Sequence, residues 1–365
     1  MATTQQLAKS IVRGSLRPRE YEAVLISCAP HTMELAEQVA IECQRAGADP
    51  GLWLDTDAVF YGQFKNYPLE NLRRVSAHCL GLLEYMNSYV WLGGVRDPSG
   101  MARVPRERWA AYNEGEQAHS DKGNEKKTKN VGVGLGLLTR ERAKSYAFSF
   151  ATWKAQMEAA IAVNYRQMES LGKTVTGLLE QPVGVRVTAD NGTDLTFRLG
   201  GASRRAHLND GVIGEEDLAA GNLDVSLPAG SVEVAPLEES GNGTFVADSP
   251  TPQYGKRIEG LAWTFRNGHV VDFTAKRNLA LAQTGWETAT GAKDMFATFG
   301  LGLNRKAKAG FLNNGIVAGT ATVTIGENRN TGGVNRSSFG AVGFLTSATV
   351  EIAGKTIVEA GRWVI

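Results

Sequence analysis

The spacing of apolar residues changes near residue 180, and this change constrains the fold more than any other feature of the sequence. Before it, short apolar runs alternate with helical patterns. Ala23–Cys28 is typical of a strand buried on both faces, and residues 31–46 form an amphipathic helical pattern. After Pro182, apolar residues recur at every second position, as in strands that are buried on one face.

The first part of the chain is predicted to be an N-terminal α/β domain with a mostly parallel sheet, covering residues 1–175. Further strand patterns occur at residues 50–55, 88–92 and 131–138. Residues 150–171 carry an apolar residue every three or four positions, which predicts one long helix connecting the two halves.

The second part, residues 176–365, is predicted to be a mainly antiparallel β domain with a few helices. Turn sequences at residues 190–192, 267–268 and 353–355 each separate two strand patterns, which indicates three hairpins. Two domains are also what a chain of 365 residues is expected to form, so the fold class is α/β followed by antiparallel β.

Composition argues against several classes of partner. The net charge of +1 suggests neither nucleic acid nor a membrane surface, and no apolar run approaches the length of a membrane span. The three cysteines, Cys28, Cys43 and Cys79, are scattered and fit no zinc site, which is typical of a reducing compartment. The N-terminus lacks the pattern of a signal peptide, so we expect a cytoplasmic protein.

Five segments of the second half resemble the active-site half of the aminopeptidase T family, thermophilic metallopeptidases with two metal ions. They are residues 227–236, which begin Leu-Pro-Ala-Gly, and residues 258–261, 300–304, 319–326 and 335–342. The related 2,5-dihydroxypyridine dioxygenases, which use one iron, look similar here too. The resemblance implies a homodimer assembled largely through the C-terminal half.

The positions at which the resemblance implies metal ligands carry no side chain that is suited to a metal. A two-metal hydrolase needs carboxylates and imidazoles that converge on the ions. The matching positions here are Ser231, Thr298, Thr322, Gly340 and Val342. The dioxygenases use a histidine at the position of Thr298 and the same final pair of ligands, so they do not match either. We therefore expect neither a metal nor another cofactor at these positions.

Without a metal, the chemistry would depend on acid–base groups. Glu233 is a candidate general base, since burial can raise the pKa of a carboxylate toward the working pH, or it is an outward-facing residue of a strand. Ser231 and Ser338 are candidate nucleophiles, or small residues that fill the space of lost ligands. Arg336 could bind a substrate anion or be a surface charge. Thr298, Thr322 and Asn304 are the remaining candidates for substrate contacts.

Three functions remain open from the sequence. The first is a metal-independent hydrolase of a small amide, peptide or cyclic substrate. The second is a non-catalytic homologue that binds a small molecule or peptide, or has a structural role. The third is an aminopeptidase or ring-cleaving dioxygenase that holds a metal through different ligands. Fold resemblance alone does not decide between them.

Overall fold

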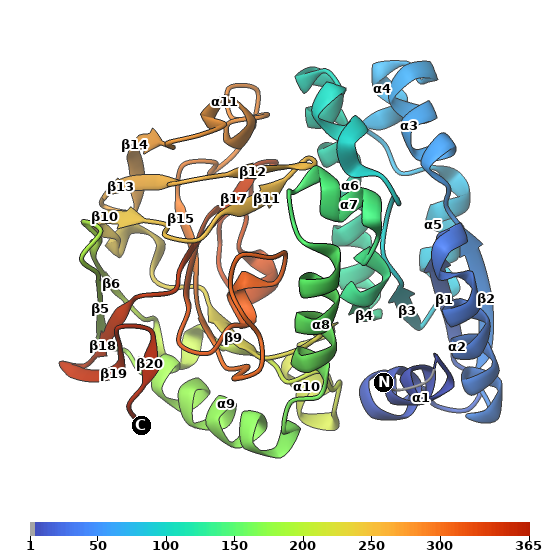
Figure 1. The fold of residues 1–365 in the computed structure, drawn as a ribbon, viewed down its shortest axis with the longest axis horizontal. Helices are drawn as coiled ribbons and strands as arrows, with labels where there is room; N and C mark the ends of the chain where they lie inside the picture. Colours follow the sequence, from blue (N-terminus) through green and yellow to red (C-terminus); the bar gives the residue numbers. More distant parts are fainter. Residues whose placement is uncertain (1–3) are drawn as a thin grey trace. The chain divides into compact units, whose positions relative to one another are not determined.

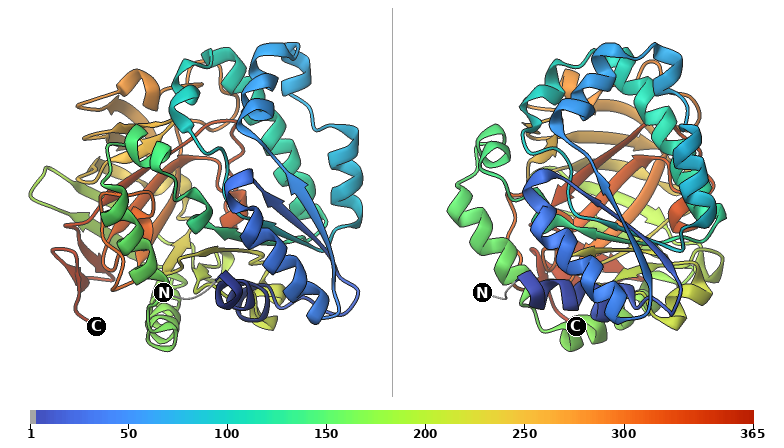
Figure 2. Two further views of the ribbon diagram at one scale, coloured as in Figure 1. Left: turned by 45° about the vertical axis from the view of Figure 1, so that its right-hand side comes forward. Right: turned by 90° about the vertical axis from the view of Figure 1, so that its right-hand side faces the viewer.

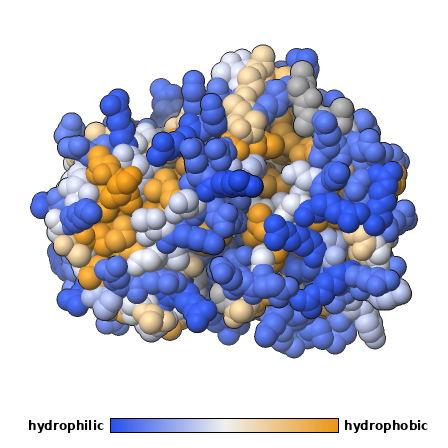
Figure 3. All heavy atoms as spheres, turned by 90° about the horizontal axis from the view of Figure 1, so that it is seen from below, coloured by the Kyte–Doolittle hydropathy of each residue, from blue (hydrophilic) through white to orange (hydrophobic). Residues whose placement is uncertain are grey.

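A computed structural model describes residues 4–365, which divide into two compact units. The N-terminal unit comprises the chain up to Ile161 together with Gly211–Ala229, and the C-terminal unit comprises Ala162–Asp210 and Gly230–Ile365. Among the described residues, no helix combines the length and the hydropathy that a bilayer-spanning segment needs. On the face drawn in Figure 3, apolar residues form separate patches among hydrophilic ones.

The N-terminal unit is built on a five-stranded sheet with the order β2-β1-β3-β4-β8, in which every neighbouring pair is parallel. Its strands are β1 (Ala23–Cys28), β2 (Asp49–Leu54), β3 (Ser88–Trp91), β4 (Lys129–Val133) and β8 (Asp224–Leu227). Helix α2 (Met33–Arg45) buries Ala36 and Val39 and packs along β1 and β2 (Figure 2). The predicted parallel α/β layer is thus confirmed.

The other helices of this unit are mostly short. They are α1 (Thr4–Lys9), which continues into a π-helical segment Ser10–Leu16, then α3 (Asp57–Asn66), α4 (Leu69–Leu72), α5 (Ala77–Tyr85), α6 (Arg106–Glu125), α7 (Arg140–Ser145) and α8 (Phe150–Ile161). Threonine hydroxyls cap two of them. Thr56 accepts a hydrogen bond from the Val59 amide at the start of α3, and Thr139 accepts one from the Arg142 amide at the start of α7.

The predicted helix at residues 150–171 is wrong, because the chain forms two helices there. Helix α8 ends at Ile161, and α9 (Tyr165–Leu179) begins after Asn164, whose side chain accepts a hydrogen bond from the Gln167 amide at 3.2 Å. An N-cap of this kind satisfies a free amide at the start of a new helix. The strand predicted at residues 131–138 is also shorter, because β4 ends at Val133.

The division into units differs from the predicted single boundary at residue 175. Helix α9 belongs to the C-terminal unit, and Gly211–Ala229 returns to the N-terminal unit. The reason for the return is β8, which adds to the edge of the parallel sheet with Val225 opposite Val131. This pairing joins residues far apart in the sequence, so no local pattern reveals it.

Two antiparallel sheets make up most of the C-terminal unit (Figure 1), and the predicted antiparallel domain with a few helices is confirmed. The eight-stranded sheet has the order β14 (His269–Thr274), β13 (Ala262–Arg266), β10 (Asn242–Val246), β6 (Asp194–Arg198), β5 (Gly184–Thr188), β18 (Thr349–Ile352), β19 (Lys355–Glu359), β20 (Arg362–Trp363). The five-stranded sheet has the order β17 (Gly340–Leu345), β16 (Ala321–Gly326), β15 (Phe296–Gly302), β9 (Ser231–Val234), β7 (His207–Asn209).

Four short elements complete the chain. A two-stranded sheet joins β11 (Thr251–Gln253) and β12 (Lys256–Ile258), and the helices are α10 (Glu215–Ala220) in the N-terminal unit and α11 (Leu279–Ala282) in the C-terminal unit. The three predicted hairpins are confirmed as β5-β6, β13-β14 and β18-β19. In the second, Asn267 and Gly268 both have positive φ, 49° and 78°, as a tight two-residue hairpin turn requires.

Aromatic side chains fill the space between the two large sheets. Phe197 of β6 lies 5.0 Å from Phe299 of β15, measured between ring centroids, and also 5.0 Å from Phe296. Because side chains alternate along a strand, Phe299 and Leu301 face this core, and Gly300 and Gly302 face the other way. The five-stranded sheet therefore has one apolar face and one face that the core does not occupy.

Candidate functional site

A row of paired residues crosses the five-stranded sheet on the face opposite the aromatic core. His207 of β7 pairs with Glu233 of β9, Glu233 pairs with Gly300 of β15, and Gly300 pairs with Thr322 of β16. Residues that are paired in register lie side by side on the same face of a sheet. The row thus brings a carboxylate, an imidazole and a hydroxyl together from four segments of the chain.

Glu233 extends across Gly300. A Cβ atom at residue 300 would come within 2.9 Å of the Glu233 Cγ atom and 3.2 Å of the Val232 carbonyl oxygen, so only glycine leaves room for this side chain. Burial raises the pKa of Glu233, and the nearby His207 offsets part of that shift. A carboxylate with a raised pKa is a better proton acceptor than an ordinary glutamate.

His207 was not predicted as a site residue. Its Nε2 atom is buried and has no hydrogen-bond partner among the described residues, which is uncommon for a buried polar atom. Its strand, β7, is only three residues long, so the alternation is too short to be recognised from sequence.

Three predicted residues lie on the same face as this row. Ser231 lies opposite Gly302 on the neighbouring strand, and Thr322 belongs to the row itself. Thr298 joins its hydroxyl to that of Thr324 at 2.7 Å, and its amide donates to the same Thr324 oxygen at 2.9 Å. Thr298 and Thr322 are buried, whereas Ser231 and Glu233 are partly accessible.

The other three predicted residues lie elsewhere. Asn304 is fully buried, and its side-chain oxygen accepts hydrogen bonds from the amides of Lys306 and Ala307, both at 3.0 Å, so it holds a turn. The Ser338 hydroxyl accepts a hydrogen bond from the Thr290 amide at 3.1 Å, and Arg336 is exposed.

Ser338 and Arg336 are also separated from the row along the sheet. They precede Gly340, where β17 begins, whereas the row meets β17 near its other end, at Phe344. Six residues of extended chain span about 20 Å, so Ser338 does not reach Glu233. The structure does not bring these two residues together with the carboxylate.

The donor atoms of this face do not fit two divalent cations. Two of the positions at which the family resemblance implies ligands, Gly340 and Val342 on β17, have no donor side chain, and the others offer only neutral hydroxyls. Glu233 and His207 are two donors, fewer than the three or four of a protein zinc site. Across residues 4–365, no three His, Cys, Asp or Glu side chains lie close enough together to hold a metal ion.

The sequence and the fold both resemble those of known proteins. The sequence model of a family described as thermophilic metalloprotease (M29) matches residues 140–300, which include Glu233 and Gly300. A comparison with curated proteins finds no match. The predicted resemblance to the aminopeptidase T-like family is confirmed by this match and by two solved structures.

The two solved structures are similar over nearly the whole chain. Wild-type AmpT from Thermus thermophilus has a TM-score of 0.70 at 17% identity, covering 99% of both chains. The 2,5-dihydroxypyridine dioxygenase from Pseudomonas putida KT2440 has a TM-score of 0.60 at 13% identity, covering 99% of this chain and 96% of that one. The protein thus has an aminopeptidase T-like fold, which the dioxygenase shares.

Replacing Gly300 by alanine tests how tightly Glu233 is held. The new methyl group would displace the Glu233 side chain, and we expect a loss of about 1–3 kcal/mol in the free energy of unfolding, as for other overpacked sites. Urea denaturation measures it. Gly184→Ala is the matched control, since a Cβ atom there meets no atom within 4 Å on strand β5. Equal stabilities of the two variants would contradict the close contact.

Proposed function

We propose that this protein is a hydrolase of small amide or peptide substrates, in which Glu233 acts as the general base without a metal ion. The observation that carries the proposal is the pair Glu233 and His207 within the row: a carboxylate whose pKa is raised by burial lies opposite an imidazole whose buried Nε2 atom has no hydrogen-bond partner among the described residues. The M29 match and the AmpT-like fold support a peptidase-like hydrolase.

The proposed chemistry needs only proton transfer. Glu233 would take a proton from a water molecule, which then attacks the substrate carbonyl, and the protonated Glu233 would return that proton to the leaving nitrogen. His207 would hold the carboxylate in its charged form until the water is bound. The hydroxyls of Thr322 and Ser231 lie on the same face and would contact the substrate.

The pH dependence of the reaction tests these roles. Because the pKa of Glu233 is raised, kcat/KM should increase with pH along a limb whose midpoint lies above the ordinary glutamate value of about 4.3. His207 lowers the pKa of Glu233, so His207→Gln should move that limb to higher pH. Aminoacyl p-nitroanilides and dipeptides provide the assay. A limb that stays in place or moves to lower pH in this variant would argue against the assigned pair.

Binding without catalysis is the second candidate function. One observation favours it: the hydroxyls of Thr298 and Thr324 bond to one another, which makes part of this face neutral and unreactive. A metabolite that raises the melting temperature in a thermal-shift screen and is never converted would support binding over hydrolysis.

A further inference from the structure

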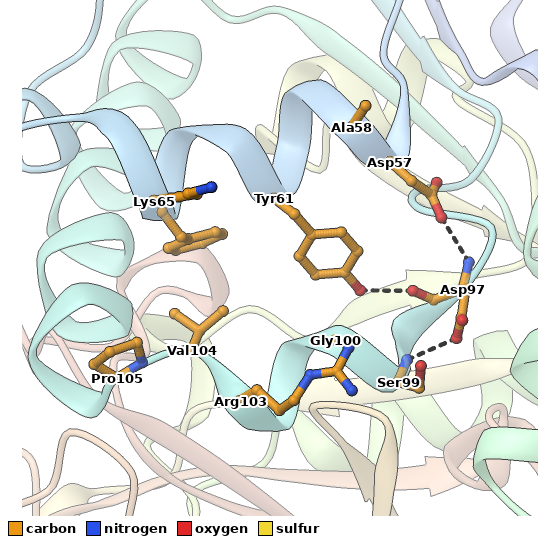
Figure 4. Close-up of a pocket in the computed structure, with 11 residues that line it drawn as sticks. Asp57, Ala58, Tyr61, Lys65, Asp97, Ser99, Gly100, Arg103, Val104 and Pro105 are labelled. Atoms are coloured by element: carbon orange, nitrogen blue, oxygen red, sulfur yellow. Dashed lines mark hydrogen bonds between the residues drawn. The ribbon is translucent and has the colours of Figure 1, made fainter.

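The N-terminal unit has a cavity of about 730 Å³ between helix α3 and the 3-10 helix Pro98–Arg103 (Figure 4). This volume lies in the range of small-molecule sites, about 300–1,000 Å³. The cavity belongs entirely to the N-terminal unit, whereas Glu233 and His207 belong to the C-terminal one. The function proposed above does not use it.

One wall of the cavity is held in place by hydrogen bonds. Both carboxylate oxygens of Asp57 accept backbone amides, that of Arg96 at 2.7 Å and that of Asp97 at 2.9 Å. The Tyr61 hydroxyl donates to the Asp97 carbonyl at 2.6 Å, and its ring lies so close to Gly100 that a Cβ atom there would meet it at 2.8 Å. The Tyr61 ring is therefore positioned before any ligand arrives.

Apolar groups form the floor. Phe64 is only 5% exposed and packs against Trp109, with 4.7 Å between ring centroids. This contact fixes the position of the Phe64 ring. Val104 and the Tyr61 ring also line the cavity and add to its apolar surface. Such a surface suits an aromatic ring, since aromatic pairs gain about 0.5–1.5 kcal/mol beyond simple burial.

Two cations at this cavity have no protein partner. In Figure 4, Lys65 extends along α3 toward Tyr61, and Arg103 extends along the 3-10 helix toward Gly100. Both are exposed, and neither forms an ion pair or a hydrogen bond with any residue in the described part of the chain. Both oxygens of the Asp57 carboxylate already accept hydrogen bonds from backbone amides. This carboxylate therefore does not neutralise Lys65 or Arg103 by direct contact.

We propose that this cavity binds a small aromatic carboxylate. The ring lies against Tyr61 and Phe64, and the carboxylate lies between Lys65 and Arg103. A guanidinium group matches the planar geometry of a carboxylate with two parallel hydrogen bonds, and an ammonium group adds a second charge-assisted bond. The hydroxyl of Tyr61 stays protonated at neutral pH, because burial raises its pKa to about 12, so Tyr61 itself adds no negative charge. The carboxylates of Asp57 and Asp97 also line the cavity, and both accept hydrogen bonds from backbone amides.

Calorimetric titration of the full chain with benzoate at low ionic strength tests the proposal. We expect saturable binding that Lys65→Met and Arg103→Met each weaken about tenfold, because each removes one charge-assisted contact. Lys144→Met is the matched control, an exposed lysine outside the cavity, and should bind benzoate as the natural protein does. Benzyl alcohol, which has the ring without the charge, should bind at least about tenfold more weakly.

Several results would overturn the proposal. The first is the absence of saturable benzoate binding, and the second is equal benzoate affinity in Lys65→Met, Arg103→Met and Lys144→Met. The third is tighter binding of phenyl phosphate than of benzoate, which would show that the site prefers another anion to a carboxylate. Glu233→Gln separates this site from the proposed hydrolase. Benzoate binding should be unchanged in that variant, whereas a loss would place the ligand at the other site.

Discussion

Glu233→Gln should lower kcat/KM for small peptide or amide substrates by about 10²–10⁴-fold, the usual contribution of a general base. Glutamine has nearly the same shape as glutamate, so it can lie across Gly300, but it does not accept a proton from water. The loss should appear in kcat more than in KM, because the proton moves only in the transition state.

Stability separates this effect from a folding defect. The pKa of Glu233 is raised in the folded state, so its contribution to stability is full below the unfolded pKa and is lost as pH rises through the folded pKa. Removing the charge should therefore leave the free energy of unfolding at pH 8 equal to or above that of the natural protein. Glu239→Gln, at an exposed glutamate nearby in sequence, is the control and should keep full activity.

Two results would contradict this account of Glu233. One is a Glu233→Gln variant with full activity. The other is a variant that loses activity only because it unfolds, shown by a lower free energy of unfolding. A different pair of results would assign the reaction to a serine nucleophile. In that case Ser231→Ala abolishes turnover, and a covalent acyl intermediate accumulates in the natural protein.

Arg204→Met should lower the free energy of unfolding by about 3–5 kcal/mol, the cost of leaving a buried charge without its partner. Arg204 and Glu238 are 8% and 7% exposed, and the Arg204 Nη2 atom lies 2.7 Å from the Glu238 Oε2 atom. Arg204 also donates to the Gly332 carbonyl at 2.6 Å. Methionine keeps most of the volume but leaves Glu238 charged and buried.

The loss in the free energy of unfolding should be large because Glu238 also forms hydrogen bonds to both ends of the loop at residues 328–334. Its Oε1 atom accepts hydrogen bonds from the Asn328 side chain at 3.0 Å and from the Val334 amide at 2.9 Å. Chemical denaturation measures the change. Arg186→Met is the matched control, since its ion pair with Asp194 is exposed, and its stability should equal that of the natural protein within error. Equal losses in the two variants would contradict the dominant role of burial.

The order of the elements follows from local patterns in the sequence. The apolar run 23–28 predicts β1 because a strand buried on both faces needs no polar alternation, and Asn267 and Gly268 predict a hairpin because they tolerate positive φ. The break between α8 and α9 was missed, since the apolar spacing continues across it and the cap at Asn164 is a weak signal. The return of β8 to the parallel sheet depends on pairing between distant strands.

The sequence groups residues that the structure brings together only in part. The motif resemblance groups Ser231, Thr322 and Glu233, and the structure places them on β9 and β16, the two strands that flank β15. It also grouped Ser338 with them, although the structure places Ser338 beyond the other end of β17. Sequence order gives no measure of distance along a strand. His207 was missed because only pairing across strands reveals its place beside Glu233.

The metal content of the active protein tests the central claim most directly. Elemental analysis of purified protein, combined with hydrolysis assays before and after a strong chelator, measures both the metal and its importance. The account predicts far less than one transition-metal ion per chain and the same rate after chelation, because the described residues of this face offer only two donors, Glu233 and His207, and no group of three. One firmly bound zinc, iron or cobalt ion per chain, with activity that disappears on chelation and returns with the metal, would contradict it.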